Sequence, residues 1–223
     1  FLGPDGTVRR PVSYDGKVVY EGELGIVIGK ECKNVPEVDV GGTIFGYTCI
    51  NDITAMELIF KDKTFPQWAR AKSFDTFGVF GPVIATGLEP GSLVVKTVLN
   101  GDERQNYPIS DMIFTVEKLV SMISHDMTLM PGDVISTGTP PGVGMGMKPP
   151  LYLKKGDELV EMGTSGNLPG SGEAVEIPDA PAGTYVIEVI NYASVTPSYT
   201  VEVGQFSAMS SKVKATKESY VLT

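Results

Sequence analysis

Apolar and polar positions along the chain divide it into short strand-like runs separated by turns. Residues 17–30 are rich in Val and Ile, which favour strands. The stretch that follows contains Pro36 and the pair Gly41 and Gly42, which indicate turns. Further runs predict strands at 79–86 and 92–100, one strand between loops within 128–150, and a strand, turn and strand at 151–162.

Two helices are predicted among these strands. Residues 46–60 indicate a strand that runs into a short helix, with Asn51 or Asp52 as its N-cap. The longer helix begins at Ser110, because apolar residues then recur at the i, i+3, i+4 and i+7 spacing of one helix face. These apolar positions are Met112, Ile113, Val116, Leu119, Val120 and Ile123.

The composition of the chain changes near Gly163. Residues 163–183 are rich in Gly, Pro and polar residues, as linkers and loops are. Residues 183–204 form two alternating strand-like runs around a turn near Pro197, which is a hairpin-like pattern. We therefore predict one main domain at 1–162, followed by a linker and a hairpin-like extension of unknown role at 163–223.

Charge and composition narrow the classes of function. The 223 residues are 42% apolar, enough for a packed core, and carry a formal net charge of −9. That charge argues against a nucleic-acid partner and against an anionic membrane surface. The chain has no membrane-spanning apolar run, no signal-peptide pattern, and two cysteines, too few for a disulfide framework. We expect a soluble protein of a reducing compartment, the cytoplasm.

Three carboxylates are the first candidates for chemistry. Glu21 and Glu23 alternate on a predicted strand, so their side chains share a face, with Cα atoms roughly 7 Å apart. Asp52 lies at the predicted strand-to-helix junction. Three carboxylates suit Mg²⁺ or Mn²⁺ better than zinc, because the chain has one histidine and no cysteine pair at ligand spacing. Taken alone, a solvated Glu-x-Glu face and a helix-capping Asp are the commoner explanation.

Several longer blocks of sequence favour a metal site over that commoner explanation. In chain order they are YEGELGIVIGK, GYTCINDITA, FPQWARAKSFDTFGVFGP, LNGDERQ, DMIF, MTLMPGDVISTGTPPGVG and LKKGDELVE. Over roughly residues 8–162, the chain closely resembles the catalytic domain of the fumarylacetoacetate hydrolase family. The resemblance implies an α+β fold, mainly β, in which a mixed β-roll carries few helices. It also implies a homodimer.

The resemblance assigns roles to individual residues. The metal ligands of the family carry over to Glu21, Glu23 and Asp52, and the implied ion is Mg²⁺ or Mn²⁺. Lys72 matches a lysine beside the metal that contacts an oxyanion or water, which makes it the candidate catalytic and substrate-binding residue. Thr76 matches a polar position near the metal. Thr139, in the TGTP block, matches a residue that binds the carboxylate or oxo group of the substrate.

The implied substrates are small 2-oxo or enol acids, including diacids. The implied reactions are C–C bond hydrolysis, isomerisation of the hydroxymuconate type and decarboxylation, as in the catabolism of aromatic compounds. The physical logic agrees, because a 2-oxo acid can chelate a cation that then acts as a Lewis acid and stabilises an enolate. A nearby lysine adds preorganised positive charge at the same oxygen.

Two departures from the family keep other functions open. The catalytic histidine of the family and its partner glutamate precede the Glu-x-Glu strand, whereas this chain begins twenty residues before Glu21 and has no histidine there. We interpret the single histidine, His125, as structural or exposed. Met56 and Ile59 replace an Arg and a Gln that often contact substrate. The alternatives are a non-catalytic protein that binds metal and oxo acid, and a truncated or fused chain that uses the domain as a scaffold.

Overall fold

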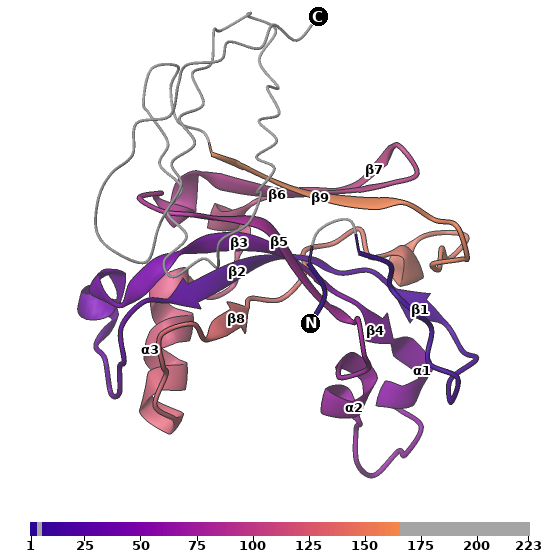
Figure 1. The fold of residues 1–223 in the computed structure, drawn as a ribbon, viewed down its shortest axis with the longest axis horizontal. Helices are drawn as coiled ribbons and strands as arrows, with labels where there is room; N and C mark the ends of the chain where they lie inside the picture. Colours follow the sequence, from indigo (N-terminus) through magenta and orange to yellow (C-terminus); the bar gives the residue numbers. More distant parts are fainter. Residues whose placement is uncertain (4–5, 166–223) are drawn as a thin grey trace, which may run out of the picture. The chain divides into compact units, whose positions relative to one another are not determined.

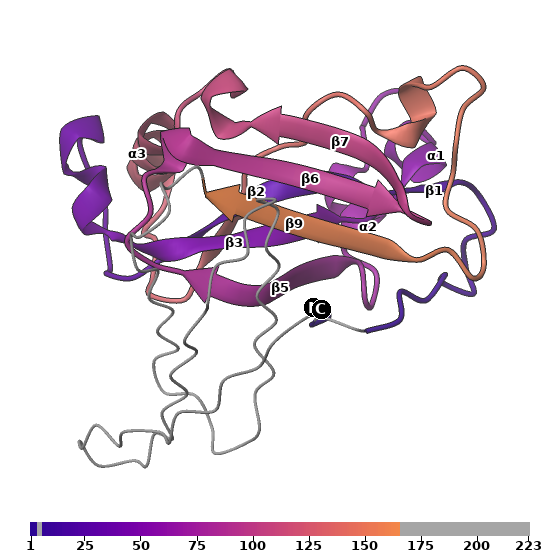
Figure 2. The same cartoon turned by 90° about the horizontal axis from the view of Figure 1, so that it is seen from above.

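Two antiparallel sheets form the main layers of the structure, a computed structural model that describes residues 1–3 and 6–165 (Figure 1). The first sheet has the strand order β5–β3–β2–β8, and the second has the order β7–β6–β9. The strands are β2 (Gly22–Ile28), β3 (Ile44–Asp52), β5 (Gly78–Ala85), β6 (Leu93–Leu99), β7 (Asp102–Pro108), β8 (Val134–Ser136) and β9 (Leu159–Ser165). Figure 2 shows the second sheet lying over the first.

Short helices and a small strand pair complete the fold. The strand pair joins β1 (Val18–Val19) to β4 (Thr54–Ala55). The helices are α1 (Met56–Ile59), α2 (Trp68–Lys72) and α3 (Val116–Asp126), with 3-10 turns at Glu37–Gly42, Pro90–Ser92, Ile109–Asp111 and Gly144–Gly146. Strands thus dominate over helices, which confirms the predicted fold class. Within residues 1–3 and 6–165, no helix has the length and apolar character needed to cross a bilayer.

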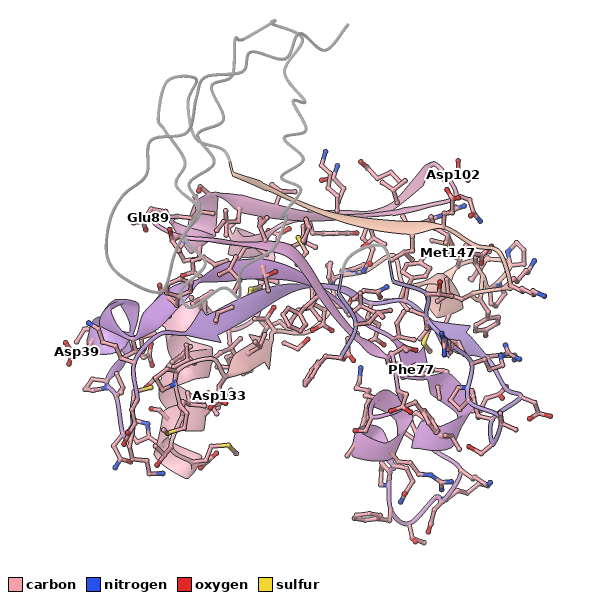
Figure 3. All side chains as sticks on the ribbon, viewed as in Figure 1. Asp39, Phe77, Glu89, Asp102, Asp133 and Met147 are labelled. Atoms are coloured by element: carbon pink, nitrogen blue, oxygen red, sulfur yellow. The ribbon has the colours of Figure 1, made fainter. Side chains whose placement is uncertain are left out.

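Two hydrophobic clusters hold these elements together. In the first, alternate residues of β2 pack against the buried face of β6 and against α3. Ile26 of β2 is fully buried there, a burial worth about 1.5–3 kcal/mol for such a side chain. The second cluster lies around α1, α2 and the start of β5 and includes Phe77, which is also fully buried and is labelled in Figure 3.

The helix after β3 differs from its prediction in how it begins. A strand does run into a short helix, as expected. However, Asp52 is the last residue of β3, Ala55 stands at the N-cap of α1, and no side chain caps this helix. The prediction of Asn51 or Asp52 as N-cap was therefore wrong. The Asp52 carboxylate bonds to Lys72, and the Asn51 side chain accepts a hydrogen bond from the backbone N–H of Glu21 at 3.2 Å.

The longer helix begins at Val116 and not at Ser110. Thr115 supplies the N-cap, since its Oγ1 accepts a hydrogen bond from the backbone N–H of Lys118 at 3.2 Å. Met112 and Ile113 precede the helix, and Ile113 is 93% exposed. The apolar spacing continued by chance across the end of the preceding loop, and the capping threonine decides where the helix begins.

Two further differences concern strands. β7 was not predicted, because its sequence DERQNYP is polar and lacks the apolar alternation of a strand. Residues 151–154 do not form the predicted strand, and only β9 forms in that region. β9 also continues through Ser165, past the boundary that we placed at residue 162. The rest of the predicted extension at 163–223, which includes most of the linker and the whole hairpin at 183–204, lies outside the described residues.

Candidate functional site

Three carboxylates meet where β2 begins and β3 ends. The structure brings together one carboxylate oxygen each from Glu21, Glu23 and Asp52, all within 4.8 Å of one another. The antiparallel register causes this, because Gly22 pairs with Asn51 and the backbone N–H of Asp52 donates to the carbonyl of Glu21 at 2.9 Å. The three predicted ligands therefore form one cluster, and their metal-binding role stays a prediction.

Lys72, the last residue of α2, closes one side of this cluster. Its Nζ lies 2.9 Å from Glu21 Oε2 and 2.9 Å from Thr54 Oγ1, and it also donates to Asp52 Oδ2. Burial lowers the pKa of Lys72, but hydrogen bonds to Asp52 and Glu21 outweigh it, so the pKa lies above its ordinary value. Burial also raises the pKa of Glu21, against the opposing effect of Lys72. The lysine therefore stays charged between two carboxylates.

Glu23 is the most enclosed member of the cluster. Its side chain is 3% exposed, and its Oε2 accepts hydrogen bonds from Ser136 Oγ and, at 2.9 Å, from the backbone N–H of Gly138. Burial raises the pKa of Glu23 to about 7, although these two hydrogen bonds favour the carboxylate. A buried carboxylate of this kind favours a positive partner, because bringing in positive charge offsets its lost hydration.

The segment after β8 runs alongside β2 toward its start. β8 pairs with β2 only through Gly25–Val27, so on the edge of β2 that faces away from β3, no strand among the described residues pairs with Gly22. Side chains and single backbone groups make the contacts there. In order they join Thr137 Oγ1 to Leu24 O, Gly138 N to Glu23 Oε2, Thr139 Oγ1 to Gly22 O, and Tyr20 OH to Gly142 O. This arrangement places Thr139 beside the Glu-Gly-Glu sequence.

A cavity of about 510 Å³ opens beside Glu23 and Thr139. Its other walls are largely apolar and come from the end of β7, the residues before α3, and the segment after β8. They are Leu24, Val95, Tyr107, Pro108, Ile109, Asp111, Met112, Ile113, Phe114, Leu119, Thr137, Gly138, Pro140 and Pro141. The apolar residues that were expected inside a helix, Met112 and Ile113, thus line this cavity.

Other predicted positions make contacts elsewhere in the fold. Thr76 has a left-handed backbone (φ +72°), and its Oγ1 accepts a hydrogen bond from the backbone N–H of Arg9 at 2.8 Å. His125 is exposed near the end of α3, and its Nδ1 lies 2.7 Å from the carbonyl oxygen of Ser121. Ile59 is 1% exposed in the second hydrophobic cluster, and Met56 is half-buried at the start of α1.

Three residues around the site were not predicted from sequence. Thr54 bonds to Lys72, Ser136 bonds to Glu23, and Gln105 bonds to Thr139. All three lie within or next to the sequence blocks that resemble the family, which was the available signal. Their roles depend on contacts between segments far apart in sequence, and no local pattern encodes those contacts.

Known proteins are similar to this chain in sequence and in fold. The family model described as "Fumarylacetoacetate (FAA) hydrolase C-terminal" matches residues 1–173. Oxaloacetate tautomerase YisK of Bacillus subtilis is 45% identical over 143 residues, which cover 67% of this chain and 46% of that protein. The mitochondrial oxaloacetate tautomerase fahd2 of Xenopus laevis is 40% identical over 173 residues, which cover 74% of this chain and 54% of that protein.

A solved structure agrees with these sequence matches. The 5-carboxymethyl-2-hydroxymuconate delta-isomerase from Mycobacterium smegmatis is 39% identical, with a TM-score of 0.65 over 78% of this chain and 62% of the other. The chain spans about half the length of the curated relatives that it matches. The match to the family model over residues 1–173 shows that the chain belongs to the fumarylacetoacetate hydrolase family.

Proposed function

We propose that this domain belongs to a divalent-metal-dependent enzyme that acts on small 2-oxo or enol acids. The carboxylate cluster carries the proposal: Glu21, Glu23 and Asp52 offer oxygens within 4.8 Å of one another, with Lys72 beside them. The two tautomerases and the isomerase among the relatives support a reaction that interconverts oxo and enol forms. C–C bond hydrolysis and decarboxylation are the further reactions to be tested.

The donor set fits Mg²⁺ or Mn²⁺. With all four groups charged, the three carboxylates and the ammonium of Lys72 carry a net charge of −2, which a divalent cation balances. The donors are hard carboxylate oxygens, the type that Mg²⁺ and Mn²⁺ prefer. Glu21, Glu23 and Asp52 would hold the ion. When bound, such an ion supplies Lewis-acid chemistry by stabilising negative charge on a substrate oxygen.

The remaining groups act on the acid itself. Lys72 places a fixed positive charge beside the carboxylates, where it can stabilise developing negative charge on an oxo oxygen. Thr139 lies between Gly22 and the cavity and is the candidate contact for the substrate carboxylate or oxo group. The apolar walls of the cavity offer contacts for the carbon chain of the acid.

Metal binding and turnover test this proposal together. Titration calorimetry with Mn²⁺ should give saturable binding to the wild type. Glu23→Gln should weaken that binding by at least about 10- to 100-fold, the loss already seen when outer-shell partners of metal ligands are removed. The matched control is Glu31→Gln, which makes the same change at an exposed position and should leave binding unchanged.

Turnover is measured with oxaloacetate, an acylpyruvate and a hydroxymuconate analogue. Conversion of at least one of them should require Mg²⁺ or Mn²⁺, stop with EDTA and fall sharply in Glu23→Gln. Turnover that survives both EDTA and Glu23→Gln would refute the proposal.

Binding without turnover is the second candidate function. Among the described residues, no histidine joins the carboxylate cluster, and His125 bonds to Ser121 on α3. This function predicts tight Mn²⁺-dependent binding of oxalate, an analogue of a 2-oxo acid, without conversion of any oxo acid. The same calorimetry and turnover assays therefore separate the two candidates.

A further inference from the structure

Gln105 is a fully buried amide in the middle of β7. Its residue is 1% exposed, and it pairs across the sheet with Thr97 of β6. The register shifts next to this pair, because the following pair joins Val98 to Glu103 and Arg104 stands opposite no residue. A β-bulge of this kind changes the direction in which neighbouring side chains point. Here it accompanies a polar side chain that is turned into the interior.

Every hydrogen-bonding position of the Gln105 amide has a partner. Its Oε1 accepts from the backbone N–H of Gly22 at 3.0 Å and from Thr97 Oγ1 at 2.8 Å. Its Nε2 donates to Thr139 Oγ1 at 2.8 Å and to the carbonyl of Pro140 at 2.9 Å. An amide offers two donors and two acceptor sites, so all four are used.

These four bonds connect Gln105 to three other segments, which are β2, β6 and the loop after β8. Gly22 lies between the two glutamates of the cluster, and Thr139 and Pro140 belong to the loop that lines the cavity. The Thr139 hydroxyl accepts from Gln105 and donates to Gly22 O at 3.1 Å, so the amide also sets the direction of the hydroxyl proton. Gly142 lies so close to β7 that a β-carbon would overlap the carbonyl oxygen of Arg104.

An ordinary core role does not explain this choice of residue. A buried amide without partners costs about 1–3 kcal/mol, whereas an apolar side chain of similar size fills the same space without that cost. The amide is tolerated because its four partners are in place. Its effect is directional: it fixes the distance between the Glu-Gly-Glu strand and the Thr139 loop.

We propose that Gln105 is a positioning residue, which holds Thr139 and Pro140 in register with Glu21, Gly22 and Glu23. It touches neither the ion nor the acid. It aligns the group that binds the acid with the carboxylates that bind the ion. The inference rests on the proposed function, and it adds a buried residue from the middle of β7 to a site whose cavity is already lined by the end of that strand.

Gln105→Glu in the full chain is the most selective variant. Its carboxylate keeps an oxygen that accepts from Gly22 and Thr97, but it can no longer donate to Thr139 and Pro140. Gln105→Met is the second variant, because it is uncharged, of similar length and lacks all four bonds. Asn106→Asp is the matched control, since it makes the same amide-to-acid change at the next residue of β7, which is exposed. Thr139→Val removes the hydroxyl that receives the Gln105 bond.

Calorimetry should distinguish an effect on Mn²⁺ binding from an effect on oxalate binding. Gln105→Met adds no charge and should bind Mn²⁺ within about twofold of wild type. Both Gln105 variants should bind oxalate to the Mn²⁺-loaded protein about 10- to 100-fold more weakly, the factor expected for a misplaced or unpaired hydrogen-bonding group. Gln105→Met combined with Thr139→Val should lose no more affinity than the larger single change, because both act through one contact. Amide hydrogen exchange at residues 137–142 should be faster in both Gln105 variants.

The outcomes separate this inference from the proposed function. Wild-type oxalate affinity in both Gln105 variants would overturn the inference and leave the proposed function standing. Equal loss of Mn²⁺ and oxalate affinity, together with a lower melting temperature, would show a general structural role and overturn it as well. If the wild type itself binds no Mn²⁺, the proposed function falls and the inference falls with it.

Discussion

The two sides of the carboxylate cluster are built in different ways. On the sheet side, Glu23 lies within β2, is 3% exposed, and receives hydrogen bonds from Ser136 and Gly138. On the helix side, Lys72 ends a five-residue helix that has no side-chain cap. The side chain of Lys72 is 25% exposed, and its partners include the same carboxylates that it neutralises.

This difference separates two tasks within one site. The sheet fixes Glu23 through contacts that do not involve the ion, so this side is preorganised. Lys72 is positioned in part by the charges of Glu21 and Asp52, so its position depends on what else binds there. We therefore expect perturbations of the sheet side to change metal affinity, and perturbations of the helix side to change mainly the response to the acid.

The largest expected effect comes from the core beneath the helix side. Phe77→Ala should lower the free energy of unfolding by about 3–5 kcal/mol, the usual cost of emptying a fully buried Phe site. Urea denaturation measures this loss. Phe60→Ala, at an aromatic residue that is 57% exposed, is the control and should cost less than about 1 kcal/mol. If folded Phe77→Ala protein has lost Mn²⁺ binding, the two sides are not separable.

A smaller effect is expected when one hydrogen bond is removed on either side of the carboxylate cluster. Ser136→Ala removes a donor to Glu23 and should weaken Mn²⁺ binding by about tenfold or more, because partners of metal ligands tune affinity by that amount. Thr54→Val removes one partner of Lys72 and should change Mn²⁺ affinity by less than about threefold. Calorimetry on both variants decides the point. Equal losses would contradict the proposed division of tasks.

Lys72→Met should change Mn²⁺ affinity in the opposite direction, toward tighter binding. Removing a positive charge next to the carboxylates should tighten Mn²⁺ binding by about tenfold at low salt, because repulsion between the two cations is lost. Turnover of the oxo acid should fall in the same variant, since the charge that stabilises the oxyanion is gone. Weaker Mn²⁺ binding in Lys72→Met would mean that the lysine orients the ligands and is not a competing charge.

The smallest expected effect concerns the N-termini of α3 and α2. Thr115→Ala should lower the free energy of unfolding by about 1 kcal/mol, because α3 loses the side chain that caps it. Gln67 stands at the corresponding position of α2 without a capping bond, so Gln67→Ala should cost less than about 0.5 kcal/mol. Thermal unfolding followed by circular dichroism checks both. A larger loss in Gln67→Ala would show that α2 depends on this residue in another way.

Local sequence patterns predicted the strands that carry the cluster better than the residues that complete it. Alternation and β-branched residues indicated the strand containing Glu23, and the strand-to-helix junction at Asp52 was recognised. The N-cap role of Asp52 was wrong, because the helix begins only at Met56, and the Asp52 carboxylate bonds to Lys72. β7 and Gln105 could not be found by periodicity, because that strand is polar and its pairing depends on a bulge.

The loop after β8 is hydrogen-bonded at one end to β2 and at the other end to Tyr20, which precedes β2. Thr137 bonds to the Leu24 carbonyl at one end, and Gly142 receives the Tyr20 hydroxyl at the other. Residues 139–141 between these two fastenings face the cavity. If the proposed function holds, a combinatorial library limited to these three positions should change which acids bind while the proposed metal ligands stay in place, which makes this loop a starting point for directed evolution.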